Sequence, residues 1–179
     1  MRPLTYGILA YFDAECEARV NDLTLALNNQ GINSSIYSFN LRPHISLSSF
    51  ETNRLPELVT ALQQFASQEP ALPLKLDAIG TFQTQENVLF LSPVVTVELL
   101  ELHRRAHRLA EQFGENLNAY YQPGLWVPHL TLAMTITDLQ LAQSLEIIRG
   151  TAVFAPCTLN ALALLQFPPP LEITTFDLL

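Results

Sequence analysis

The stretch Arg42-Pro43-His44-Ile45-Ser46-Leu47 recurs 85 residues later as Val127-Pro128-His129-Leu130-Thr131-Leu132. Each copy runs through a proline, a histidine, an aliphatic residue, a hydroxyl residue and a leucine. Successive side chains of a β-strand point to opposite faces of the sheet. The sequence therefore predicts two strands in which the histidine and the hydroxyl share a polar face, while the aliphatic residues anchor the opposite face in the core.

The side chains on these two faces indicate a chemistry. Imidazole gives and takes protons near neutral pH, which suits in-line phosphoryl transfer without a metal. For either motif alone, the simpler explanation is a polar histidine at a strand end that forms its hydrogen bonds with the backbone. Two copies, which hold two of only four histidines, favour a function instead. We predict that His44 and His129 are an acid–base pair acting on a phosphodiester, and that Ser46 and Thr131 bind its non-bridging oxygens.

The rest of the chain mixes short strands with amphipathic helices. Strands are predicted over residues 4–12, 35–39, 44–50, 74–82, 88–91, 128–135, 159–167 and 171–178. Helices are predicted from the cap Asp13 to Gly31, over residues 55–65 and 96–113, and after the capping-box pair Thr137 and Gln140. Several strands are linked too tightly for parallel crossovers, so we expect a partly antiparallel α+β protein. No linker divides the sequence, which predicts a single domain over residues 1–179.

Composition narrows the class of partner. Asp and Glu number 17 against 9 Lys and Arg, the net charge is −8, and Lys75 is the only lysine. Proteins that grip long nucleic acids carry a basic stripe, so we expect no extended nucleic-acid surface. No apolar run reaches the roughly 18–20 residues of a membrane span, so no membrane partner is expected. Cys16 and Cys157 lack disulfide or zinc spacing and are expected to be buried thiols of a cytoplasmic protein, which we take to be a monomer.

Several residues near the motifs have two interpretations. Arg42 either neutralises phosphate charge beside His44 or is a solvated turn residue. Tyr120, Tyr121 and Trp126 line the approach to the second motif and are candidates to stack on a base, although core packing is favoured for Trp126.

One further pair of histidines has the spacing of a metal site. His103 and His107 lie one helical turn apart, but three arginines crowd them and no carboxylate lies between them. A solvated helix face is therefore expected there, with no metal and no cofactor in the protein.

The duplicated His-x-Ser/Thr-aliphatic motif resembles the two-histidine (2H) phosphoesterase superfamily, in particular its branch of 2′-5′ RNA ligases and cyclic phosphodiesterases. Three more segments resemble that family, so the likeness covers nearly the whole chain: Gly80-Thr81-Phe82 followed by Val88-Leu89-Phe90-Leu91, the helix with Leu102-His103, and the closing strand at 171–178. The resemblance implies a bilobal fold of two pseudo-symmetric halves with outer helices, whose histidines face each other across a central cleft. It also implies a substrate with a 2′,3′-cyclic phosphate or a 2′-5′ linkage.

The resemblance and the composition together predict a function. We expect a metal-independent phosphodiesterase that hydrolyses the cyclic phosphate of a nucleotide or a short RNA end. The same two histidines, acting in the reverse direction, would make a 2′-5′ bond, so RNA ligation is expected as the reverse activity. The alternative is a non-catalytic module that binds nucleotides or RNA ends.

Overall fold

One continuous path of strands joins the two histidine motifs. The structure is a computed structural model that describes residues 4–32, 38–82, 84 and 87–179. Its seven-stranded sheet has the order β2-β1-β6-β3-β4-β5, with β7 beside β6, and all of these pairings are antiparallel. The strands are β1 (Thr5–Phe12), β2 (His44–Phe50), β3 (Leu72–Thr81), β4 (Leu89–Pro93), β5 (Leu130–Ala133), β6 (Pro156–Phe167) and β7 (Leu171–Asp177).

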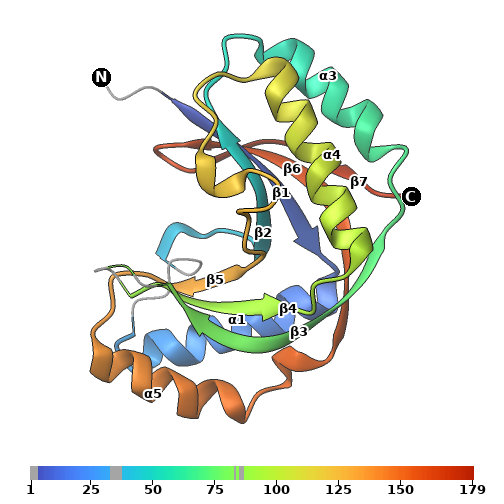
Figure 1. Cartoon of the computed structure of the whole chain (residues 1–179). Coiled ribbons are helices and arrows are strands. Elements are labelled where there is room, and N and C mark those ends of the chain that lie inside the picture. Colours follow the sequence, from blue (N-terminus) through green and yellow to red (C-terminus); the bar gives the residue numbers. More distant parts are fainter. Residues whose placement is uncertain (1–3, 33–37, 83, 85–86) are drawn as a thin grey trace.

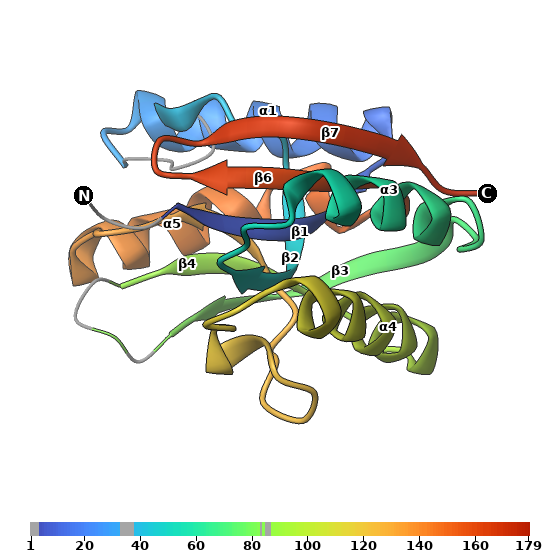
Figure 2. The ribbon, with the colours of Figure 1, turned by 90° about the horizontal axis from the view of Figure 1, so that it is seen from above.

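Helices and strands mix as the α+β class requires, which confirms the predicted class. The helices are α1 (Ala14–Asn29), α3 (Leu55–Ala66), α4 (Val97–Phe113) and α5 (Asp138–Arg149), with the short 3-10 helices η1 (Ala119–Tyr121) and η2 (Ala152–Phe154). Figure 1 shows α3 and α4 together at one end of the molecule and α1 and α5 together at the other; α4 contacts β2, and α1 contacts β6 and α5. Figure 2 shows α1 and α4 on opposite sides of the strands.

The strand order is symmetric about β6 and β3. The two motif strands, β2 and β5, are the two ends of the path. They nevertheless contact each other, so the sheet curves until its ends meet. The curve is carried by β3, because residues 72–75 pair with β6 whereas residues 76–81 pair with β4. The fold thus brings together two motifs that lie far apart in the sequence.

Local sequence signals explain where the helices begin. The Asp13 carboxylate accepts a hydrogen bond from the Cys16 backbone N–H at 2.8 Å, which caps α1. Thr96 caps α4 in the same way, and Thr137 forms the predicted capping box with Gln140 at α5. The helix predictions are therefore confirmed to within a residue or two at their first turns.

Core packing explains why β1 is apolar throughout. One face of β1 packs in the main core, and the other face packs in a smaller cluster made of Leu9, Tyr11, Ala161, Ala163 and Leu165. Both faces are covered, so a period-two alternation is absent from this strand. Cys16 and Cys157 are buried free thiols, as expected from the sequence.

Several strand ends differ from the prediction by one to three residues, and two of the differences lie at or next to the motifs. The second motif was predicted to be a strand over residues 128–135, but β5 covers only Leu130–Ala133. Pro128 has no N–H to donate to a ladder, and Thr135 adopts a positive φ of 57°, so both flanks leave the strand conformation. Of the strand predicted at residues 35–39, the first three residues lie outside the described part, while Ser38 and Phe39 are helical.

Candidate active site

The first motif is placed by the pairing of β2 with β1. His44 begins β2 and lies opposite Tyr11, and Ser46 lies opposite Leu9. Ile45 and Leu47 are fully buried, whereas His44 and Ser46 are only partly covered. The alternation predicted from the sequence is therefore present, with the histidine and the hydroxyl on the same face of the strand.

The second motif repeats this pattern of burial. Leu130 and Leu132 are fully buried, and His129 and Thr131 are partly covered. Thr131 lies opposite Phe90 of β4, while His129 immediately precedes β5. The two histidines are close enough for a positive charge on His129 to lower the pKa of His44. The fold therefore assembles the two motifs into one site.

Identical backbone contacts fix both imidazole rings. The Nδ1 atom of His44 lies 2.7 Å from the carbonyl oxygen of Arg42, and that of His129 lies 2.7 Å from the carbonyl oxygen of Val127. A carbonyl oxygen only accepts, so Nδ1 carries the proton in each ring. In the neutral ring Nε2 is then left with a lone pair, and in the charged ring it carries a transferable proton. Each histidine is thus oriented to act through Nε2.

Burial acts on both imidazoles in the same direction. The pKa of His44 and the pKa of His129 are lowered from the ordinary value of 6.5, chiefly because their charged forms lose contact with water. The backbone hydrogen bond opposes this shift in each case, because it favours the charged ring. Both rings are therefore neutral near pH 7 before a substrate brings negative charge to them.

The two rings differ in their neighbours. His44 meets the edge of Tyr11, with ring centroids 6.4 Å apart, and the Tyr11 hydroxyl donates to Glu172 at 2.8 Å. His129 instead meets two phenyl rings, Phe82 at 4.9 Å and Phe90 at 5.5 Å between centroids. The first histidine thus lies beside a tyrosine that is bonded to a carboxylate, and the second lies beside two phenyl rings. Sequence reasoning did not find these flanking aromatic residues.

One sequence signal did mark the phenyl pair. Gly80 of β3 lies opposite Phe90, and a Cβ atom at Gly80 would overlap the Phe90 ring. Phe90 in turn packs on Phe82 with centroids 4.5 Å apart. Glycine is therefore required at position 80 for the phenyl group to reach His129.

Arg42 is placed beside the first motif but already has partners. Its guanidinium Nη2 lies 2.7 Å from the Glu17 carboxylate, and its Cζ lies 4.0 Å above the Tyr11 ring. The sequence allowed two roles for Arg42, a phosphate ligand or a solvated turn residue. The structure shows an exposed arginine that is neutralised by a carboxylate, so contact with phosphate requires it to leave or share Glu17.

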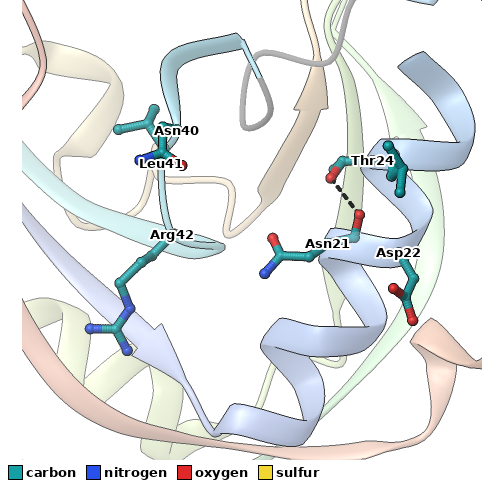
Figure 3. Close-up of a pocket in the computed structure, with 7 residues that line it drawn as sticks. Asn21, Asp22, Thr24, Asn40, Leu41 and Arg42 are labelled. Atoms are coloured by element: carbon teal, nitrogen blue, oxygen red, sulfur yellow. Dashed lines mark hydrogen bonds between the residues drawn. The ribbon is translucent and has the colours of Figure 1, made fainter. Parts of the chain in front are cut away.

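Figure 3 shows the surroundings of Arg42, an open pocket between α1 and residues 40–42. Asn21, Asp22 and Thr24 line it from the helix, and Asn40 and Leu41 line it from the other side. Neither catalytic candidate lines this pocket. It borders the first motif only through Arg42 and is distinct from the space between the histidines.

The three aromatic candidates near the second motif lie in different environments. Tyr120 is 81% exposed, whereas Trp126 is buried and its ring stacks on His103 with centroids 3.9 Å apart. Trp126 therefore has the packing role that the sequence favoured, and its ring face is not free for a base. Tyr121 is partly covered, and its hydroxyl lies close to the Ser46 side chain. The pKa of Tyr121 is raised, because burial outweighs the opposing effect of Ser46.

The solvated helix face predicted for His103 and His107 is wrong. Their exposed fractions are 2% and 3%, and both lie on the buried stripe of α4 with Leu99, Leu102, Ala106 and Ala110. The stripe has helical spacing, and Trp126 supplies the packing partner that the sequence pattern did not reveal. Burial lowers the pKa of His103 to about 4.

The described residues contain neither a metal centre nor a membrane helix. Among the described residues, no three histidine, cysteine or acidic side chains gather as a metal site would require. In the same part of the chain, no helix combines the length and apolar character needed to cross a membrane.

Comparison with known proteins places the chain in a family. Residues 12–168 match the model of the 2′-5′ RNA ligase superfamily. No curated protein sequence matches significantly.

Solved structures show the same fold at low sequence identity. The apo form of E. coli LigT is 14% identical with a TM-score of 0.68, and the comparison covers 99% of both chains. TT0787 of Thermus thermophilus is 15% identical with a TM-score of 0.62, and 97% of each chain is covered. Usb1 of Kluyveromyces marxianus is 11% identical with a TM-score of 0.53 over 99% of this chain and 98% of that chain.

The first prediction concerns the coupling of the two imidazoles. We expect NMR titration of the wild type to give a pKa below 6.5 for both His44 and His129. In His129→Asn, the pKa of His44 should rise, because a positive neighbour that lowers it is gone. It should stay below 6.5, because desolvation is the larger cause. An unchanged His44 titration in the variant would show that the rings are too far apart to act on one phosphate.

The second prediction concerns Gly80. In Gly80→Ala the new methyl group forces the Phe90 ring toward His129, which should lower stability by about 1–3 kcal/mol, as overpacking does. Gly150→Ala is the matched control, because nothing lies within 4 Å of a Cβ atom there. Denaturant unfolding and the His129 imidazole chemical shift measure the effect. Equal behaviour of the two variants would mean that Phe90 does not depend on the glycine.

Proposed function

Because the chain belongs to the 2′-5′ RNA ligase superfamily, we propose that it is a metal-independent phosphodiesterase that hydrolyses 2′,3′-cyclic phosphates. The observation that carries this proposal is the matched pair of imidazoles. Both His44 and His129 have Nδ1–H fixed on a backbone carbonyl at 2.7 Å, which leaves both Nε2 atoms for proton transfer. A hydroxyl two residues later accompanies each ring on its polar face.

The reaction needs one proton removed and one proton supplied. The neutral histidine accepts a proton from water at Nε2 as the water oxygen attacks phosphorus. The protonated histidine donates its Nε2 proton to the 2′ or 3′ oxygen as the bond from phosphorus to that oxygen breaks. One ring thus ends protonated and the other neutral, and the product is an open phosphomonoester. If the 5′ hydroxyl of a second nucleotide attacks in place of water and the 3′ oxygen leaves, the same transfers form a 2′-5′ bond, and that step run backwards cleaves a 2′-5′ linkage to a cyclic phosphate.

The hydroxyl groups have a separate task. Ser46 and Thr131 donate hydrogen bonds to the non-bridging oxygens, where negative charge accumulates in the transition state. The Tyr121 hydroxyl lies at Ser46 and can orient that donor. Arg42 is a further phosphate ligand if it exchanges the Glu17 carboxylate for the substrate.

Charge and exposure favour a small substrate. The net charge is −8, and the guanidinium beside His44 is already paired with Glu17. A long phosphate backbone would find no basic stripe to hold it. E. coli LigT has been solved in complex with 3′-AMP and with phosphate, which are ligands of the proposed size. We therefore propose nucleotides or short RNA ends as substrates, with the exposed Tyr120 available to stack on a base.

We also propose that residues 1–179 act as one cytoplasmic, monomeric domain. The single-domain part of this proposal is supported by β3, which pairs with strands of both halves.

The third prediction tests the histidine pair. His44→Ala and His129→Ala should each lower kcat for 2′,3′-cyclic nucleotides by about 10²–10⁴-fold, because each removes a proton-transfer group. Circular dichroism checks the fold of both variants. EDTA should leave wild-type turnover unchanged. The mechanism is wrong if either variant stays near wild type. If the wild type binds nucleotides but hydrolyses nothing in a panel of cyclic phosphates and 2′-5′ dinucleotides, the protein is a binding module instead.

The fourth prediction tests the hydroxyls. Ser46→Ala and Thr131→Val keep the shape of each side chain but remove the donor. Each should lower kcat by about 10²-fold, as the loss of a transition-state donor does elsewhere, while KM changes little. Thr158→Val, on a partly covered hydroxyl of β6 away from both motifs, is the control and should keep kcat. Steady-state kinetics separates the two parameters, and a change confined to KM would argue against transition-state stabilisation by these groups.

A further inference from the structure

His103 connects α4 to the segment that lies between the two motifs. Its ring stacks on Trp126 with centroids 3.9 Å apart and the two planes 1° from parallel. Its Nε2 atom lies 3.0 Å from the carbonyl oxygen of Tyr121. One buried side chain thus holds both ends of residues 121–126, which we call the motif-linking segment.

The motif-linking segment reaches the first motif through Ser46. The Trp126 indole N–H donates to the Ser46 carbonyl oxygen at 3.0 Å. The Tyr121 hydroxyl lies close to the Ser46 side chain. Two residues that lie at Ser46, Tyr121 and Trp126, are therefore also contacts of His103. These contacts connect α4 to Ser46 of β2 through two side chains.

The same segment also leads to the second motif. Trp126 is followed directly by Val127, whose carbonyl oxygen fixes Nδ1 of His129 at 2.7 Å. This carbonyl sets both the tautomer and the direction of the His129 ring. If the stacked Trp126 moves, the Val127 peptide moves with it.

We infer that His103 is a positioning residue, which locks the motif-linking segment and thereby sets Ser46 and His129 relative to each other. For its kinetic consequence this inference rests on the proposed phosphodiesterase function. Its structural consequence is independent of any turnover, because the orientation of His129 is measurable in the free protein.

The state of His103 suits this task. Its partner at Nε2 is a carbonyl oxygen, so the proton of the neutral ring lies on Nε2. Burial lowers the pKa to about 4, and His107 and Arg104 on the same helix act in the same direction. The ring is therefore neutral under ordinary conditions and keeps a single tautomer.

The fifth prediction compares two buried histidines of one helix. His103→Leu removes both the stack and the hydrogen bond to the motif-linking segment. His107→Leu is the matched control, because His107 is equally buried but its Nε2 atom faces Glu111 at 3.7 Å, one turn further along α4, and not the motif-linking segment. We expect His103→Leu to lower kcat for 2′,3′-cyclic nucleotides about tenfold or more with KM nearly unchanged, since misplaced catalytic groups cost rate. His107→Leu should stay within about twofold of wild type.

Two milder variants separate the contacts and guard against loss of folding. His103→Phe keeps a ring on Trp126 but removes the donor to Tyr121, while His103→Gln keeps a donor but removes the ring. Both should fall between His103→Leu and wild type in kcat. Trp126 is the only tryptophan, so its fluorescence reports the stack directly. The emission should change in His103→Leu and His103→Gln and stay close to wild type in His107→Leu.

A readout without turnover separates this inference from the proposed function. The chain has four histidines, so NMR of the imidazole nitrogens resolves each ring. His103→Leu should lower the share of the His129 Nδ1–H tautomer, and His107→Leu should leave it unchanged. If the wild type hydrolyses no cyclic phosphate and His129 still responds only to His103, the proposed function fails and the positioning role stands. The role is wrong if His129 and kcat respond equally to both leucine variants, or to neither.

Discussion

The site depends on the double pairing of β3. Residues 72–75 of this strand pair with β6, and residues 76–81 pair with β4. The register shifts between Leu76 and Ala78, so Asp77 is an extra residue at the point where the partner changes. A bulge bends and twists a strand locally. The bend directs β4 and β5 back toward β2, and the two ends of the strand path come into contact.

This arrangement gives two similar strands different surroundings. His44 and His129 have the same backbone contact: the Nδ1 atom of each ring lies 2.7 Å from the carbonyl oxygen two residues earlier. The neighbours differ, because Tyr11 and its charged partners lie beside one ring and two phenyl groups beside the other. The two halves therefore have the same backbone arrangement at the histidines but different side chains around them.

The sequence predicts much of this site because strand alternation has a fixed period. A histidine and a hydroxyl two residues apart must share a face, so the polar faces around His44 and His129 followed from the motifs alone. Contacts between distant segments have no such period. The burial of His103 depends on Trp126, which lies 23 residues away and approaches through an irregular segment. The flanking role of Phe90 likewise depends on strand register, and only Gly80 hinted at it.

The path from α4 to β5 shows why an irregular segment is needed there. β2 ends the strand path and would expose the backbone groups of an edge. The connection runs along that edge instead: Glu115 pairs with Glu51 as an isolated bridge, and the Asn118 N–H donates to the Ser49 carbonyl oxygen at 2.8 Å. A regular strand here would pair with alternate residues along the whole edge of β2, whereas the irregular connection lets the Trp126 indole N–H donate to the Ser46 carbonyl oxygen. The irregular connection forms some of the hydrogen bonds that the edge of β2 would otherwise lack. It also contacts Ser46 directly through Trp126, so it belongs to the candidate site as well as linking the two halves.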